Sequence, residues 1–170
     1  NENFLFLAVK GQRNHGNQYI QEAISLGARA VITDEPVSGN IEIPVLKVDN
    51  CRKTIPLIAS NFFKNPSKKI HITGITGTNG KTSIAFIVSK ILEDAKLNWT
   101  TLGTLGLLSR NKTVKTGFTT PESIDLNKIL HDLVKIKTSN LIMEVSSHAL
   151  SQNRVGAIDF DIAVFSNLSH

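Results

Sequence analysis

The chain has 170 residues, 41% hydrophobic and 19% charged, which excludes the disordered and fibrous classes and allows one ordinary domain or two small ones. Its formal net charge is +5, but the lysines are dispersed and only 6% of residues are aromatic, which argues against nucleic-acid binding. No apolar run reaches the roughly 20 residues of a membrane helix and no signal-peptide pattern opens the chain, so we expect a cytoplasmic protein without a membrane span.

The first 63 residues alternate short apolar runs with stretches in which apolar residues recur at helical spacing. This alternation is typical of a small α/β domain. Pro56 is compatible with the second helix only in its first turn. The single cysteine, Cys51, has no disulfide or metal-ligand partner, so we expect it at a helix start or in the core. The predicted elements are strands at 4–9, 30–33 and 45–48 and helices at 17–26 and 54–63.

A polar segment, residues 64–69, separates this region from the next. Pro66 disfavours a helical conformation at the residue before it, and the other side chains are polar or charged. We therefore place a linker here, with an N-terminal domain at 1–66 and a central domain at 67–170.

The second region has longer helices and more apolar strands. Strands without polar alternation are expected where helices cover both faces of a parallel sheet, so we expect an α/β domain with a mostly parallel sheet. A polar loop is expected after the second strand. The predicted strands are 70–75, 100–105, 141–145 and 162–165, and the predicted helices are 82–95 and 122–136. The helix faces expected to pack are Ile84, Val88, Ile91 and Ala95 on the first, and Leu126, Ile129, Leu130, Leu133 and Val134 on the second.

A glycine-rich turn, residues 77–82, joins a predicted strand to a predicted helix. Glycines let main-chain N–H groups approach phosphates, the helix N-terminus adds positive charge, Lys81 can reach the terminal phosphates, and the Thr82 hydroxyl can bind Mg²⁺. The general phosphate-loop spacing requires glycine where Ile75 stands, so a tight turn with an incidental lysine remains the alternative. The residues expected to bind ATP are Gly77, Thr78, Asn79, Gly80, Lys81, Thr82 and Ser83.

Polar side chains also follow other predicted strands. Glu144 ends an apolar strand near this loop, where a carboxylate is suited to holding Mg²⁺ against phosphates; capping of a following helix is the alternative. Thr119, Thr120 and Ser146 offer hydroxyls at the edge where open α/β sheets bind ligands, although turn and N-cap roles suit them too. The Arg154 guanidinium could bind a carboxylate or phosphate with two hydrogen bonds.

The chain resembles the Mur ligase family, and most closely its MurE type. The phosphate loop after Ile75-Thr76 is shared by many ligases, including folylpolyglutamate synthases, whereas the segments at 119–123 and 143–150 are much more specific. The matching segments are Thr119-Thr120-Pro121-Glu122-Ser123, Met143-Glu144-Val145-Ser146-Ser147-His148-Ala149-Leu150 and, near the N-terminus, Phe6-Leu7-Ala8-Val9-Lys10-Gly11 with Gly16 and Tyr19.

This resemblance implies a monomeric, ATP- and Mg²⁺-dependent, amide-bond-forming ligase of peptidoglycan synthesis. It would add meso-diaminopimelate or L-lysine to UDP-MurNAc-L-Ala-D-Glu through an acyl phosphate, and residues 1–66 would bind the UDP part. Lys81 and Glu144 would act in catalysis, and Thr82 and Glu144 would hold Mg²⁺. The residues implied to contact the UDP-MurNAc-dipeptide are Thr119, Thr120, Ser146, Gln152 and Arg154 and, on a weaker match, Gln12, Arg13 and Asn14.

Parts of the family pattern are missing. The family continues Asn-Leu-Ser-x with Asp-His-Leu-Asp, but residues 167–170 stop at the x position, so His170 is not the family's metal ligand. A later lysine, the C-terminal amino-acid-binding domain and the first N-terminal strand are also absent, so we expect this chain alone to be inactive. The role of His148 stays open. A folylpolyglutamate- or cyanophycin-synthetase-like ligase and a non-catalytic nucleotide-binding module remain alternatives.

Overall fold

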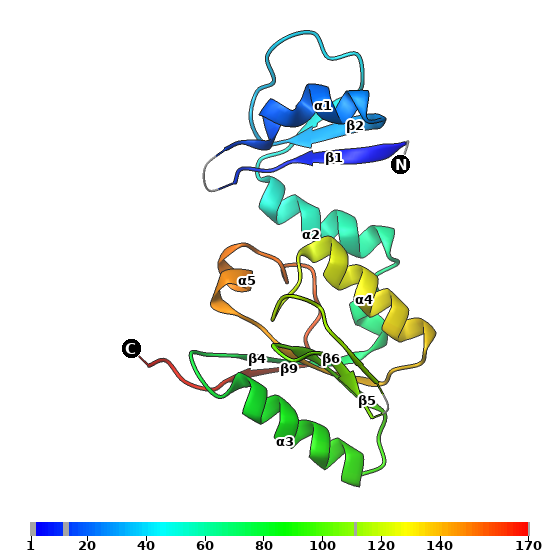
Figure 1. The fold of residues 1–170 in the computed structure, drawn as a ribbon, viewed down its shortest axis with the longest axis vertical. Coiled ribbons are helices and arrows are strands. Elements are labelled where there is room, and N and C mark those ends of the chain that lie inside the picture. Colours follow the sequence, from blue (N-terminus) through cyan, green and yellow to red (C-terminus); the bar gives the residue numbers. More distant parts are fainter. Residues whose placement is uncertain (1–2, 12–13, 111, 170) are drawn as a thin grey trace. The chain divides into compact units, whose positions relative to one another are not determined.

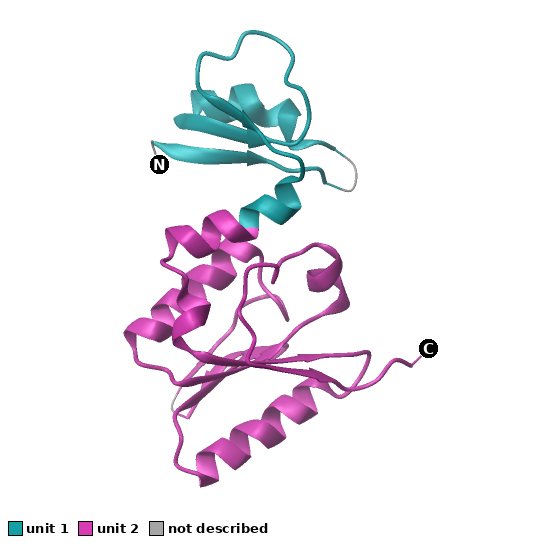
Figure 2. Cartoon of the chain, turned by 180° about the vertical axis from the view of Figure 1, so that it is seen from behind, with its two compact units in different colours: residues 1–55 teal, residues 56–170 magenta. Residues whose placement is uncertain are grey.

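A computed structural model of the chain describes residues 3–11, 14–110 and 112–169 (Figure 1). The chain forms two compact units, residues 1–55 and 56–170 (Figure 2). Both units combine parallel strands with helices, which confirms the predicted α/β class. The division falls within a helix at Pro56, earlier than the expected linker, and the domain boundary after residue 66 stays a prediction.

Unit 1 is built on a parallel sheet with the strand order β1-β2-β3. The predicted helix at 17–26 is divided into a short 3₁₀ turn and an α-helix. Buried Ala8, Ile20 and Val31 form the centre of the apolar core, so the helix packs on the strands through the face that carries Ile20 and Ile24. The elements are β1 (Phe4–Ala8), η1 (Gly16–Tyr19), α1 (Ile20–Ser25), β2 (Ala28–Thr33) and β3 (Val45–Lys47).

The helix after β3 begins earlier than predicted. α2 (Cys51–Phe62) starts three residues before the expected position, so Pro56 lies in the second turn and the prediction of a first-turn proline is wrong. A proline there has no N–H for the helical hydrogen bond. The expected linker is also more ordered than predicted, because η2 (Pro66–Lys69) is a 3₁₀ turn whose Pro66 and Ser67 are buried.

Unit 2 contains a mixed sheet with the strand order β7-β6-β5-β8-β4-β9. β5, β8, β4 and β9 run parallel, whereas β6 and β7 are antiparallel. The last two form a hairpin where a polar loop was predicted; Gly106, with φ of 96°, allows the tight turn from β5 into β6. The strands are β4 (His71–Thr76), β5 (Trp99–Gly103), β6 (Gly106–Ser109), β7 (Lys112–Val114), β8 (Asn140–Glu144) and β9 (Ile162–Phe165).

Helices cover both faces of this sheet. α3 (Lys81–Asp94) lies on one face, and α4 (Ser123–Lys135) and α5 (Ser147–Ser151) lie on the other (Figure 1). Side chains of β8 alternate between the two layers: Ile142 packs with α3, and Leu141 and Met143 pack with α4. The apolar face predicted for α4 is confirmed, with Leu126, Leu130 and Leu133 buried and Ile129 and Val134 packed against them.

Two expectations about burial in unit 2 are wrong. Ile91, assigned to the packed face of α3, is 61% exposed, and Ala95 is also exposed; buried Ala85 and Ser89 lie on the packed face instead. The strand at 162–165 has the predicted bounds, but it is not buried: Ile162 is 57% and Phe165 65% exposed. β9 is an edge strand that pairs only with β4 in the described sheet, which explains its exposure.

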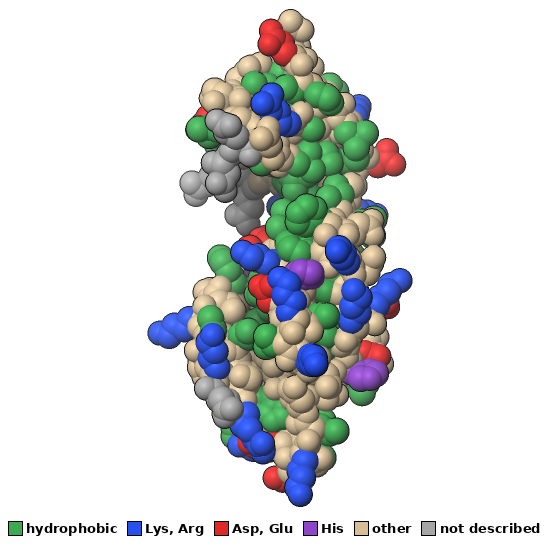
Figure 3. All heavy atoms as spheres, turned by 90° about the vertical axis from the view of Figure 1, so that its right-hand side faces the viewer, with side chains coloured by type: hydrophobic (Ala, Val, Ile, Leu, Met, Phe, Trp, Pro, Cys, Tyr) green, Lys and Arg blue, Asp and Glu red, His purple; other side chains and the backbone are tan. Residues whose placement is uncertain are grey.

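Basic side chains do not gather into one field on the face drawn in Figure 3. Lys and Arg side chains are scattered among acidic, apolar and uncharged groups there. This agrees with the dispersed lysines of the sequence. Within the described ranges, every helix is too short or too polar to cross a membrane.

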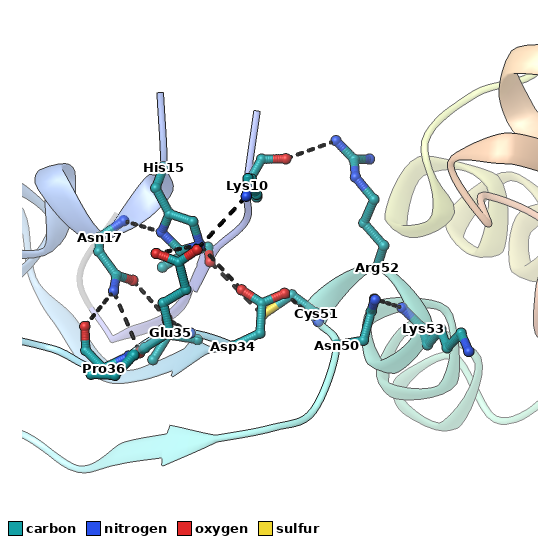
Figure 4. Close-up of polar contacts among 12 residues, drawn as sticks. Lys10, His15, Asn17, Asp34, Glu35, Pro36, Asn50, Cys51, Arg52 and Lys53 are labelled. Atoms are coloured by element: carbon teal, nitrogen blue, oxygen red, sulfur yellow. Dashed lines mark hydrogen bonds and ion pairs between the residues drawn. The ribbon is translucent and has the colours of Figure 1, made fainter. Parts of the chain in front are cut away.

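A partly buried polar network in unit 1 joins the ends of β1 and β2 to the start of α2 (Figure 4). The His15 Nδ1 accepts the Asn17 N–H at 3.1 Å, so its Nε2 carries the proton and donates to Asp34 Oδ1, also at 3.1 Å. Asp34 Oδ2 accepts the Cys51 N–H at 2.9 Å. Burial raises the Asp34 pKa, but hydrogen bonds from Cys51 and His15 outweigh it, so the pKa lies below its usual value.

This network gives His15 a role that the sequence did not predict and confirms the expectation for Cys51. The His15 ring both caps η1 and pairs with Asp34. Cys51 is the first residue of α2 and is fully buried, as predicted. Burial and the neighbouring Asp34 charge raise the pKa of the Cys51 thiol to about 11.

Cys51 should therefore resist alkylation while unit 1 is folded. At pH 8 a thiol with this pKa is about one part in a thousand thiolate, and the buried sulfur is inaccessible until the structure opens. The rate of iodoacetamide labelling, followed by mass spectrometry, should be far lower in buffer than in about 6 M urea, a concentration that unfolds most small domains. Equal rates in the two solutions would contradict the burial of this thiol.

The Asp34 contribution to stability should disappear in acid. Because its pKa is lowered on folding, the contribution is present above the unfolded pKa of about 3.9 and is lost as pH falls through the lower folded value. Urea unfolding of unit 1, followed by Tyr19 fluorescence, should show that Asp34→Asn is less stable than wild type at pH 7. The difference in unfolding free energy between the two proteins should shrink toward about pH 3. A difference of the same size at both pH values would contradict this role.

Candidate functional site

The turn between β4 and α3 has the backbone that its glycines permit. Gly77 has φ of 133° and Gly80 has φ of 85°, both in the region that side-chain-bearing residues rarely adopt. Gly80 directly precedes the first residue of α3, Lys81. The predicted arrangement of strand, glycine-rich turn and helix is therefore present, and the turn ends at the N-terminus of a long helix.

Free donors collect at this helix start. Within the described part of the chain, the main-chain N–H groups of Lys81, Thr82 and Ser83 have no protein acceptor. The Lys81 ammonium folds over the turn and donates to the carbonyl oxygens of Gly77 at 2.6 Å and Thr78 at 3.1 Å. N–H groups at a helix N-terminus together with an ammonium group make a site suited to phosphate.

Glu144 lies beside this turn because β8 pairs with β4. Glu144 is opposite Ile75 in the parallel register, and its side chain is only 3% exposed. The Thr82 hydroxyl donates to Glu144 Oε2 at 3.0 Å, so the two residues predicted to hold Mg²⁺ are in direct contact. A buried carboxylate requires such donors, because burial without them would be costly.

Thr104 is a residue of this site that the sequence did not reveal. Its N–H donates to Glu144 Oε1 at 3.2 Å, and its hydroxyl lies 3.0 Å from Glu144 Oε2 and 3.2 Å from the Thr119 hydroxyl. The preceding residue, Gly103, must lack a side chain, because a Cβ there would collide with the Glu144 carboxylate. The turn between β5 and β6 positions both residues, and the only signal in the sequence was the spacing of Gly103 and Gly106.

Thr120 and Ser146 lie together beside the main chain of Glu144. The Thr120 hydroxyl is 3.0 Å from the Glu144 carbonyl and accepts the Ser146 N–H at 3.0 Å. Ser146 is the N-cap of α5, since its hydroxyl accepts the Ala149 N–H. The N-cap role considered for this group of residues therefore belongs to Ser146, while Thr120 is buried and joins two loops.

Arg154 is held by protein groups. Its Nη1 donates to the Thr120 carbonyl at 2.9 Å, its Nη2 lies 2.8 Å from Glu122 Oε1, and its Nε and Nη2 both donate to Gln152 Oε1. The Ser123 hydroxyl also donates to the Arg154 carbonyl. The guanidinium thus fastens the segment at 119–123 to the end of α5, and a bound anion would have to share or replace these partners.

The remaining candidates are residues 12–14, in the N-terminal part of the chain, and His148. Gln12 and Arg13 lie outside the described residues, and Asn14 belongs to unit 1, where its carbonyl accepts the Gly11 N–H. His148 is exposed on α5. The contacts described for unit 2 assign it no role at Glu144.

The residues just after β9 contact the glycine-rich turn at 77–82, which the sequence did not predict. The chain beyond β9 lies beside the connection from β4 to α3 (Figure 1). Ser166, Asn167 and Ser169 each hydrogen bond to residues of the turn. Gly77 must be glycine here for a second reason, because a Cβ would collide with the Ser166 hydroxyl.

Two family models match the chain. Residues 75–170 match the model described as the Mur ligase middle domain, and residues 1–63 match the one described as Mur ligase family, catalytic domain. Solved structures agree. A structure named UDP-N-acetylmuramoyl-L-alanyl-D-glutamate–2,6-diaminopimelate ligase has a TM-score of 0.84 and 26% identity over 98% of this chain and 34% of its own. The MurF ligase of Thermotoga maritima in complex with ADP, with a TM-score of 0.60 and 23% identity over 98% of this chain and 35% of its own, shows the fold alone.

Sequence relatives share the name of the first structure. The UDP-N-acetylmuramoyl-L-alanyl-D-glutamate–2,6-diaminopimelate ligase of Caldanaerobacter subterraneus subsp. tengcongensis is 43% identical over 98% of this chain, and that of Clostridium perfringens is 42% identical over 96%. The chain spans 34% of the length of each of these relatives. Because family models match residues 1–63 and 75–170 and relatives are 43% and 42% identical over nearly the whole chain, the chain belongs to the Mur ligase family.

Proposed function

We propose that the protein carrying this chain is an ATP-dependent ligase of peptidoglycan precursor synthesis. It joins a diamino acid to UDP-MurNAc-L-Ala-D-Glu, and the names of the relatives favour 2,6-diaminopimelate. The observation that carries the proposal is the direct contact between Thr82 of the phosphate turn and buried Glu144. Because the chain spans about a third of its relatives, ligation would require parts beyond the residues described here.

ATP would bind with its phosphates against the turn. The free N–H groups of Lys81, Thr82 and Ser83 would donate to phosphate oxygens, and the Lys81 ammonium would exchange its carbonyl partners for the terminal phosphates. ADP in the Thermotoga maritima MurF structure, which shares this fold, supports a nucleotide in this family.

The oxygen atoms of Thr82 and Glu144 suit Mg²⁺. Their contact of 3.0 Å places a hydroxyl and a carboxylate close enough to bind one cation. The described residues contain no cluster of three or more His, Cys, Asp or Glu side chains that could hold a metal. Magnesium commonly takes one or two protein ligands and completes its coordination with phosphates and water, so this pair fits the ion. Bound there, Mg²⁺ would neutralise charge on the transferred phosphoryl group.

The reaction would have two steps. An oxygen of the D-Glu carboxylate attacks the γ-phosphorus as the bond to ADP breaks, giving an acyl phosphate. The amine of the diamino acid then attacks the acyl carbon, inorganic phosphate leaves, and the amine loses a proton. In the first step this chain's own groups align the phosphates and stabilise their charge, which is how phosphoryl transfer is generally catalysed.

Binding of the UDP-MurNAc-dipeptide is proposed for the edge formed by Thr119, Thr120, Ser146, Gln152 and Arg154. Thr119 is the best placed of these, because its hydroxyl is in an exposed hydrogen bond and lies 3.2 Å from the Thr104 hydroxyl beside Glu144. Thr120, Gln152 and Arg154 would act mainly by fixing the loops around the substrate, since their polar groups already have protein partners. Residues 12–14 are proposed for the uridine end only from the family resemblance.

A folylpolyglutamate-like ligase is disfavoured by unit 1. Such a ligase lacks a UDP-binding domain before the phosphate loop, whereas residues 1–63 of this chain match a Mur ligase family model. A non-catalytic nucleotide-binding module remains a rival. It would bind ATP and the UDP-dipeptide without forming ADP and phosphate.

Replacing Lys81 should separate ATP chemistry from substrate binding. In the protein at its full natural length, Lys81→Ala should lower acyl-phosphate formation by at least about 100-fold, because the terminal phosphates lose their ammonium partner. Binding of the UDP-MurNAc-dipeptide, measured by calorimetry, should change by less than about twofold. The matched control is Lys90→Ala, a lysine on the exposed side of α3 that pairs with Glu93. Unchanged turnover in Lys81→Ala would refute the assignment.

Displacing Glu144 should impair the use of Mg²⁺ without removing any charge. Gly103→Ala would push a methyl group into the Glu144 carboxylate and move it from Thr82. We expect the Mg²⁺ concentration needed for half-maximal activity to rise about tenfold or more. The measurement is a Mg²⁺ titration of ATP turnover, with Glu144→Gln as the variant that removes the charge. A Gly103→Ala enzyme with a wild-type Mg²⁺ requirement would contradict this geometry.

A further inference from the structure

The segment after β9 makes three hydrogen bonds, through one residue, Asn167, to the glycine-rich turn at 77–82 that is proposed to bind phosphate. Its main-chain oxygen accepts the Thr78 N–H at 2.9 Å. Its side-chain Oδ1 accepts the Asn79 N–H at 3.1 Å, and its Nδ2 donates to the Asn79 carbonyl, also at 3.1 Å. The side-chain amide thus pairs with both polar main-chain groups of Asn79, as a neighbouring β-strand would.

These contacts divide the donors of the turn into two sets. The N–H groups of Thr78 and Asn79 point to Asn167, whereas those of Lys81, Thr82 and Ser83 have no acceptor among the described residues. The turn has a glycine on each side of this pair, Gly77 and Gly80, so its backbone would otherwise have many accessible conformations. A contact that removes those conformations before ATP arrives lowers the entropic cost of binding.

We propose that Asn167 is a positioning residue of the nucleotide site, which clamps the Asn79 peptide groups so that the free N–H groups of α3 are presented to phosphate. The inference rests on the proposed function, because it assigns Asn167 to the ATP site. Neighbouring contacts support the clamp: the Ser166 hydroxyl lies 2.7 Å from the Asn79 carbonyl, and the Ser169 hydroxyl accepts from the Asn79 side chain at 3.1 Å. Asn167 itself need not touch the nucleotide.

The first test uses no ligand. In Asn167→Ala the Asn79 amide loses its acceptor, while the Thr78 amide keeps the main-chain oxygen of residue 167. Residue-resolved hydrogen exchange in the protein at its full natural length should therefore show faster exchange at Asn79 and little change at Thr78. Unchanged exchange at Asn79 would overturn the clamp, whatever the protein's activity.

The second test measures ATP binding by calorimetry. Asn167→Ala should raise the ATP dissociation constant about tenfold, the effect of losing two ordinary hydrogen bonds. Asn167→Asp should weaken binding at least as much, because it keeps the acceptor but turns a second oxygen toward the Asn79 carbonyl. The matched control is Asn140→Ala, which removes a side-chain bond to the Asn98 carbonyl at the opposite end of β8.

The control separates positioning from general stability. Asn140→Ala should lower the melting temperature of unit 2 while leaving the ATP dissociation constant within about twofold of wild type. If Asn167→Ala and Asn167→Asp bind ATP as tightly as Asn140→Ala does, the role inferred for Asn167 is overturned. The proposed function is not affected by that result. A wild-type protein that binds no ATP would overturn the proposed function, and the exchange at Asn79 would still report whether the clamp exists.

Discussion

The buried carboxylate of Glu144 is the constraint around which the site of unit 2 is arranged. A carboxylate that is almost removed from solvent needs hydrogen-bond donors, and here they come from two separate parts of the chain, α3 through Thr82 and the turn from β5 to β6 through Thr104. The same contact requires glycine at position 103. The residue that faces the proposed metal thus also ties the glycine-rich turn at 77–82, the hairpin and the segment at 119–120 to the end of one central strand.

Those parts of the site that follow from local sequence could be predicted. A strand, two glycines, a lysine and a helix in immediate succession dictate the backbone of the turn at 77–82, and an apolar strand ending in Glu144 places a carboxylate at the same edge of the sheet. The packed face of α4 was predictable for the same reason, since it depends on the spacing of apolar residues within one helix.

The parts that failed depend on pairings between distant residues. The sequence around His15 does not predict its contact with Asp34, and the sequence around Asn79 does not predict its contact with Asn167. Each pair meets only when the strands are assembled. Arg154 was judged by its chemistry alone, whereas its Thr120, Glu122 and Gln152 partners become visible only in the fold. The burial of β9 was misjudged because an apolar run gives composition but not position, and an edge strand can have the same composition as a central one.

The contact between Asn79 and Asn167 spans 88 residues, which has a consequence for how the protein is made. β4 and α3 are adjacent in the chain and can form while translation continues, but their connecting turn gains its last partners only after β9 has been synthesised and added to the sheet edge. The ribosome thus releases the strand and helix long before the site is complete. A nascent chain that stops short of β9 contains every glycine and the lysine of the turn, yet its backbone lacks the long-range contacts that select one conformation.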